Sequence, residues 1–196
     1  DLKAKSLALA LNCVVASVEY RLAPEHPFPA PLEDCYAALK WLAANAKQLG
    51  VNPARIAIGG ASAGGGLAAV LGLLARDRKE VSVCYQLLIY PMIDDTNVEQ
   101  AGPNVPDSPR WSRANNLVGW RSYLNQEPGS EGVSEYAAAF RAKDVSGLPP
   151  TYIGVGTPDL FRDEDIAYAQ RLIKAGVPTE LHVDADGFHG FDSFAA

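Results

Sequence analysis

The sequence predicts an α/β domain built on a doubly wound, mainly parallel sheet. Short apolar segments rich in β-branched residues alternate with stretches of helical periodicity along most of the 196 residues. The connections are long enough to carry crossover helices, which parallel neighbouring strands require. With 48% hydrophobic and 20% charged residues, the chain can build one core. We therefore expect one domain over residues 1–196, with a cap-like excursion from the sheet at about 94–148.

The first 90 residues predict an alternation of helices and strands around one proline-rich loop. Pro24, Pro27 and Pro29 lie in that loop, where each fixes φ and lacks an N–H donor, and Gly50 follows the next helical stripe. We expect, in order, a helix at 3–11, a strand at 13–19, the loop at 21–30 and a helix at 32–46. A strand at 55–59, a helix at 63–76 and a strand at 81–90 follow.

The second half of the chain is less regular before the alternation resumes. Between 94 and 148 turn-forming and polar residues dominate, around one expected helix at 111–124. A strand at 151–155, a helix at about 163–175 ended by Gly176 and Pro178, and a strand at 179–183 complete the pattern. The sequence thus predicts five strands in total.

Composition excludes several classes of partner. The chain has 17 Lys and Arg against 23 Asp and Glu, a net charge of −6, which disfavours nucleic acid because its affinity comes mainly from basic side chains. No run of about 18 apolar residues predicts a membrane segment. The three cysteines, Cys13, Cys35 and Cys84, are odd in number and lack C-x-x-C spacing, so we expect buried free thiols in a reducing compartment. No His/Cys/Asp cluster has zinc-ligand spacing, and we expect no metal or cofactor.

The sequence G-x-S-x-G at residues 60–64 marks Ser62 as a candidate nucleophile. It lies where a predicted strand ends and a helix begins, so the serine oxygen would project above the sheet. We expect Gly60 and Gly64 to be required because the turn is too tight for a Cβ, and the N–H of Ala63 to bind a developing oxyanion. The alternative is a phosphate-binding turn, but neither G-x-G-x-x-G nor G-x-x-x-x-G-K-[ST] is present.

A serine nucleophile needs a histidine base, and the chain has three. His26 lies in the proline-rich loop and His182 within a predicted strand. His189 follows the last strand in a loop containing Gly187 and Gly190, whose backbone freedom would let the imidazole reach the serine. We therefore predict that His189 is the base.

The acid that orients the histidine is expected after the strand at 151–155. Asp159 lies just beyond the carboxyl end of that strand, at the sheet edge where Ser62 also emerges. Carboxylates at 163–165 open the next helix, where capping and the helix dipole alone explain them. Asp163 stays as the alternative to Asp159. The predicted order Ser, Asp, His is one of the known triad orders.

Four segments together resemble the hormone-sensitive-lipase-like (family IV) branch of the α/β-hydrolases. They are Y-R-L-A-P-E at 20–25, G-A-S-A-G-G at 60–65, D-L-F-R-D-E at 159–164 and H-G-F at 189–191. The resemblance implies a cofactor-free serine carboxylesterase of the cytoplasm that hydrolyses esters of short to medium acyl chains. The candidates to line the pocket for the acyl or alcohol part of the ester are the aromatic residues Tyr90, Trp111, Trp120 and Phe188.

One family motif is absent from residues 1–196, the H-G-G-G segment that supplies further oxyanion donors and would precede residue 20. Since Asp1 is not a translation start, we expect the chain to be a piece of a longer enzyme with weak or no activity alone. Two other functions stay open: a peptidase or amidase on the same fold, and a non-catalytic ligand-binding module. The expected partner is a small ester, and the sequence leaves a homo-oligomer undecided.

Overall fold

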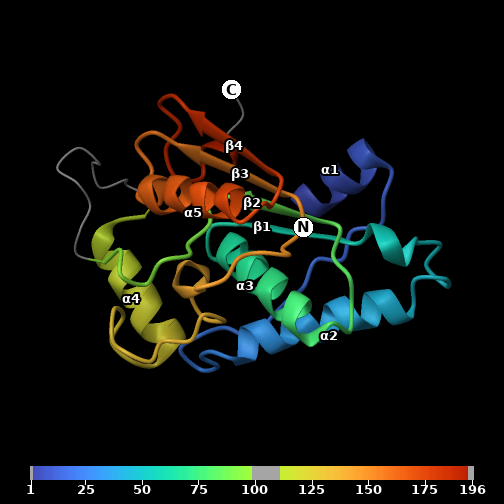
Figure 1. Ribbon diagram of the computed structural model, residues 1–196, viewed down its shortest axis with the longest axis horizontal. Helices are drawn as coiled ribbons and strands as arrows, with labels where there is room; N and C mark the ends of the chain where they lie inside the picture. The colour runs from blue at the N-terminus through green and yellow to red at the C-terminus, as the bar shows by residue number, and fades with distance from the viewer. Residues whose placement is uncertain (1, 99–110, 194–196) are drawn as a thin grey trace.

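The computed structural model describes residues 2–98 and 111–193, whose strands form a single parallel sheet (Figure 1). The four strands are adjacent in chain order, with Ile58 opposite Gln86 and Gly156 opposite Asp184 in the register. They are β1 (Ala57–Ala61), β2 (Tyr85–Ile89), β3 (Thr151–Gly156) and β4 (Thr179–Asp184). The predicted parallel α/β architecture is confirmed. Because all four strands run in one direction, their carboxyl ends meet at one edge of the sheet.

Three helices, one before β1 and two between strands, build the main core. Helix α3 (Ala63–Arg78) packs on β1 and β2, α2 (Ala30–Ala44) packs on α3, and α5 (Arg162–Lys174) packs on β3 and β4. The middle of α3 is buried from Gly65 to Ala75, and its small residues let the helix approach the strands closely. One apolar cluster joins the three helices to the sheet through Ile58, Leu88 and Ile153. Helix α1 (Leu2–Leu11) lies at the edge of the molecule (Figure 1).

The predicted strand at 13–19 is wrong. These residues form no strand, and Val14 and Val15 are 51% and 36% exposed. A strand requires a hydrogen-bonded neighbour as well as suitable composition, and no described strand pairs with this segment. Strand β1 pairs with β2 alone and is the outermost described strand on its side of the sheet.

Two other strands begin later than predicted. The strand expected at 55–59 occupies 57–61 because Pro53–Arg55 form a 3-10 turn, capped by Asn52, whose side chain accepts a hydrogen bond from the Ala54 N–H at 3.0 Å. The strand expected at 81–90 is limited to 85–89. The prediction of buried cysteines is wrong: Cys13 and Cys84 are exposed because neither lies within a paired strand, and Cys35 on α2 is half-buried.

The excursion after β2 contains α4 (Arg113–Leu124), close to the predicted helix at 111–124. Its N-terminus is capped by Ser112, whose hydroxyl accepts a hydrogen bond from the Asn115 N–H at 3.2 Å. A second apolar cluster joins Trp120 of α4 to Met92 and Phe161. Part of the predicted excursion, residues 99–110, lies outside the described residues, and the domain boundaries stay a prediction. Among the described helices, none has the length and apolar character needed to cross a bilayer.

Candidate active site

Ser62 occupies a sharp turn between β1 and α3. Its φ of 57° and ψ of −125° are unfavourable for a residue with a side chain, so surrounding contacts must hold this backbone in place. The Ser62 N–H donates to the Ile89 carbonyl at 2.9 Å, and the Ser62 carbonyl accepts from the N–H groups of Gly66 and Met92 at 3.0 and 3.1 Å. The turn is therefore bonded both to its own helix and to the end of β2.

The glycines around Ser62 differ in how strictly they are required. A Cβ on Gly60 would lie 2.3 Å from the Gly64 carbonyl oxygen, and one on Gly66 would lie 2.1 Å from the Met92 oxygen. A Cβ on Gly64 would meet nothing within 4 Å. The crowding expected at Gly60 is present, whereas the same expectation for Gly64 is wrong. Gly66 was missed, and the signal for it was the continuous run of glycines at 64–66.

Ser62, His189 and Asp159 form a continuous hydrogen-bonded chain. Ser62 Oγ lies 2.8 Å from His189 Nε2, and His189 Nδ1 lies 2.9 Å from Asp159 Oδ2 and 3.2 Å from Oδ1. Since an ionised carboxylate only accepts, Nδ1 carries the proton and Nε2 offers its lone pair to the serine hydroxyl. Asp159 is fully buried and His189 is 7% exposed. The Phe161 N–H also donates to Asp159 Oδ1 at 3.0 Å and fixes the carboxylate's orientation.

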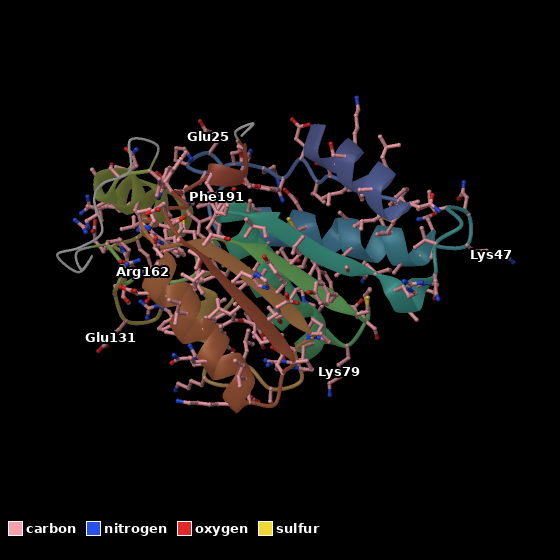
Figure 2. The ribbon with its side chains drawn as sticks, turned by 90° about the horizontal axis from the view of Figure 1, so that it is seen from above. Glu25, Lys47, Lys79, Glu131, Arg162 and Phe191 are labelled. Atoms are coloured by element: carbon pink, nitrogen blue, oxygen red, sulfur yellow. The ribbon has the colours of Figure 1, made fainter. Side chains whose placement is uncertain are left out.

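Two glycines bring the Asp159 and His189 loops together: Gly187, expected only to give its loop backbone freedom, and Gly156, which sequence reasoning missed. A Cβ on Gly156, the last residue of β3, would lie 1.5 Å from the carbonyl oxygen of Gly187. Beside this contact, the Thr157 N–H donates to the Asp184 carbonyl at 2.9 Å. The signal in the sequence was a glycine at the end of one strand, Gly156, together with a glycine-containing loop after the next strand. Figure 2 shows Arg162, which follows the first loop, and Phe191, which follows His189, at the same end of the strands.

The alternative candidates lie outside this chain of hydrogen bonds. His26 is exposed, and the exposed His182 contacts Glu180 with its Nε2 2.6 Å from the carboxylate. The Asp163 carboxylate is exposed and pairs with Arg162 at 2.7 Å. Geometry therefore favours His189 and Asp159 over each of them.

The other two carboxylates at the start of α5 are buried, which capping at an exposed helix end does not explain. Glu164 Oε1 accepts from the N–H groups of Ile93 and Asp94 at 2.9 and 3.1 Å, so it ties the loop after β2 to α5. Burial raises the pKa of Glu164 well above its usual range. Both oxygens of Asp165 lack a described hydrogen-bond partner. Burial, then the nearby carboxyls of Glu164 and Asp159, raise the pKa of Asp165 as well.

The four aromatic pocket candidates occupy different environments. Tyr90 is 3% exposed, and its ring centroid lies 4.7 Å from that of His189. Trp120 is 2% exposed and lies within the second apolar cluster. Trp111 packs against that cluster and is half-buried, whereas Phe188 is 38% exposed. Substrate contact by Tyr90, Trp111, Trp120 and Phe188 stays a prediction.

Ala63 is the first residue of α3, where backbone N–H groups have no acceptor inside the helix. Its N–H adjoins Ser62 and remains the expected oxyanion donor, reinforced by the positive end of the helix dipole. Within residues 2–98 and 111–193, no three His, Cys, Asp or Glu side chains are grouped to hold a metal ion.

Comparison with known proteins gives concordant matches. A family model described as alpha/beta hydrolase fold matches residues 3–193. Carboxylesterase NlhH of Mycobacterium tuberculosis is 39% identical over 203 residues, covering 100% of this chain and 61% of the relative. The structure of a bacterial heroin esterase is 49% identical with a TM-score of 0.85, covering 91% of this chain and 58% of that one. An esterase from Pyrobaculum calidifontis is 40% identical with a TM-score of 0.86, covering 96% and 62%. The chain thus spans about three fifths of the length of these proteins.

Proposed function

The chain belongs to the α/β-hydrolase fold family, in its hormone-sensitive-lipase-like branch, and from this premise we propose that it hydrolyses carboxylic esters of short to medium acyl chains. The observation that carries the proposal is the uninterrupted contact from Ser62 Oγ through the His189 ring to the buried Asp159 carboxylate. Relatives named as carboxylesterases and esterases support the reaction class.

Proton transfer follows the tautomer that the geometry selects. Ser62 Oγ attacks the ester carbonyl carbon while His189 Nε2 takes the hydroxyl proton, and Asp159 stabilises the resulting imidazolium. His189 then gives this proton to the leaving alkoxide, which leaves an acyl group on Ser62. A water molecule, activated by His189 in the same way, releases the carboxylic acid. The Asp159 carboxylate keeps the imidazole oriented throughout.

The negative charge of the tetrahedral intermediate develops at the start of α3. The N–H of Ala63 and the dipole of that helix favour an oxyanion there. Removing one such donor costs about 2.7–4 kcal/mol in a well-studied serine protease, so this interaction strongly affects the rate. The cost explains why the backbone around Ser62 is fixed by so many hydrogen bonds, because a donor must be in place before charge appears.

A fluorophosphonate probe tests the proposal, because it phosphonylates serines only when their hydroxyl is activated. We expect labelling of the wild-type chain to reach completion, slowly in keeping with the weak activity expected of the chain alone, and we expect no labelling of Ser62→Ala. A matched control is Ser6→Ala on α1, which removes an exposed serine and should leave labelling unchanged. Failure of the wild-type chain to label would contradict the proposal and favour a non-catalytic binding module.

An ester and its matching amide separate esterase from peptidase or amidase activity. The chain is incubated with an aryl ester and with the anilide of the same acyl group, each alongside Ser62→Ala. We expect Ser62-dependent turnover of the ester to exceed that of the amide. Preferential cleavage of the anilide would replace the proposed reaction by amide hydrolysis.

A further inference from the structure

Tyr90 connects the end of β2 to the segment that carries His189. Its hydroxyl donates a hydrogen bond to the carboxylate of Asp192, which lies three residues after His189 in the turn Phe191–Ser193. Its ring meets the imidazole edge to face, with centroids 4.7 Å apart and planes inclined by 63°. The same ring lies 6.2 Å from that of Phe191. One buried side chain thus contacts the base and the residues that follow it.

The backbone of Tyr90 is fixed to the rest of the site. Its φ of 35° is unfavourable for a non-glycine residue, and its N–H donates to the Gly154 carbonyl at 2.6 Å. The residue before it, Ile89, accepts the hydrogen bond from the Ser62 N–H. Tyr90 directly follows Ile89, which is hydrogen-bonded to Ser62, and its ring contacts His189. Tyr90 can therefore set the distance between nucleophile and base.

The Tyr90 hydroxyl is suited to act as a permanent donor. Burial, and then its hydrogen bond to Asp192, raise the pKa of Tyr90 above the usual value for a phenol. The group therefore stays protonated at neutral pH. Phe161 meets the imidazole at 5.1 Å with planes inclined by 82°, so His189 contacts two aromatic rings.

We propose that Tyr90 is a positioning residue that holds His189 in line with Ser62 through its ring and its hydrogen bond to Asp192. This inference rests on the proposed function of the triad. It assigns Tyr90 a role different from the pocket wall expected from the sequence. Since a displacement of about 1 Å can cost 10²-fold in rate, loosening this contact should slow the reaction of Ser62 by roughly 10–100-fold.

The test compares two substitutions that each delete one buried phenol hydroxyl. Tyr90→Phe keeps the ring and removes the bond to Asp192. The control, Tyr36→Phe on α2, removes a bond of the same kind, in which the hydroxyl of a buried tyrosine donates to the Glu80 carboxylate at 3.0 Å. The rate of fluorophosphonate labelling and the midpoint of thermal unfolding are measured for both. We expect labelling to be slower than wild type in Tyr90→Phe and unchanged in Tyr36→Phe. This difference should persist even if both substitutions lower the unfolding midpoint by the same amount.

A double-mutant cycle identifies the bond. Asp192→Ala should slow labelling as Tyr90→Phe does, and the double variant should be no slower than either single variant because both remove one interaction. Asp192→Asn retains an acceptor oxygen and should keep a rate closer to wild type. Additive losses from Tyr90→Phe and Asp192→Ala would overturn the proposed coupling.

A spectroscopic readout separates this inference from the proposed function. The downfield proton resonance of the His189 Nδ1–H bond to Asp159 should shift or broaden in Tyr90→Phe and stay unchanged in Tyr36→Phe. If the wild-type chain fails to label, the proposed function fails while this resonance still decides the inference. Unchanged labelling and an unchanged resonance in Tyr90→Phe would refute the positioning role, as would equal slowing by Tyr36→Phe.

Discussion

Gly60→Ala and Gly64→Ala are a matched pair that separates a required glycine from a tolerant one. Both add a single methyl group within two residues of Ser62. A Cβ on Gly60 would lie 2.3 Å from the Gly64 carbonyl oxygen, which is about 1 Å closer than an ordinary C···O contact. The atoms that it would meet belong to the backbone, so they cannot move aside as a flexible side chain could. A Cβ on Gly64 would meet no atom within 4 Å. The first substitution must displace the turn that holds Ser62, and the second need displace nothing.

These distances translate into stability and rate. Overpacking at Gly60 should cost about 1–3 kcal/mol of unfolding free energy, which lowers the thermal midpoint by roughly 2–12 °C for a domain of this size. A shift of Ser62 by about 1 Å should slow fluorophosphonate labelling by about 10²-fold. Gly64→Ala should retain the midpoint or raise it, because alanine in a helix is favoured over glycine by roughly 0.5–1 kcal/mol. Equal destabilisation by both substitutions would refute the geometric reasoning.

Three further predictions concern the triad and the buried acids. In the complete enzyme, Ser62→Ala and His189→Ala should each abolish ester turnover, and their double variant should lose little more because the two groups act as one unit; additive losses in turnover assays would contradict this. Asp159→Asn should lower turnover by about 10⁴-fold while Asp163→Asn leaves it near wild type, and the reverse result would make Asp163 the acid. The raised pKa of Asp165 means that the folded state keeps a proton which the unfolded state releases near pH 4, so the unfolding free energy falls as pH rises above that value. Asp165→Asn should flatten this fall in thermal midpoints measured from pH 4 to 7, and an unchanged slope would contradict the assignment.

Much of the site could be predicted from sequence because parallel topology determines where strand ends lie. Once Ser62, Asp159 and His189 are each placed after a strand, the parallel sheet brings them to one edge, regardless of the conformation of the segments that connect the strands. Composition could not predict what depends on neighbours. Residues 13–19 have the composition of a buried strand, yet no described strand pairs with them. Strand character requires a partner that local composition does not specify.

Side-chain environments were the least predictable feature. Trp120 and Tyr90 are both buried aromatics, but only Tyr90 contacts His189. Glu164 and Asp165 satisfy the sequence rule for first-turn carboxylates, while tertiary packing buries both. The bond from Tyr90 to Asp192 joins residues 102 positions apart, so no local pattern could reveal it.

The hydrogen bond between Ser62 and His189 also joins distant parts of the chain, 127 positions apart. During folding, the loop-closure entropy of such a contact must be offset by pairing of the intervening strands, and folds dominated by non-local pairing reach the native state slowly. His189 follows β4, which pairs with β3 alone among the described strands. An activated Ser62 can therefore arise only after β4 has docked on β3. The reactivity of one serine hydroxyl would report when refolding is complete, later than any signal from helix formation.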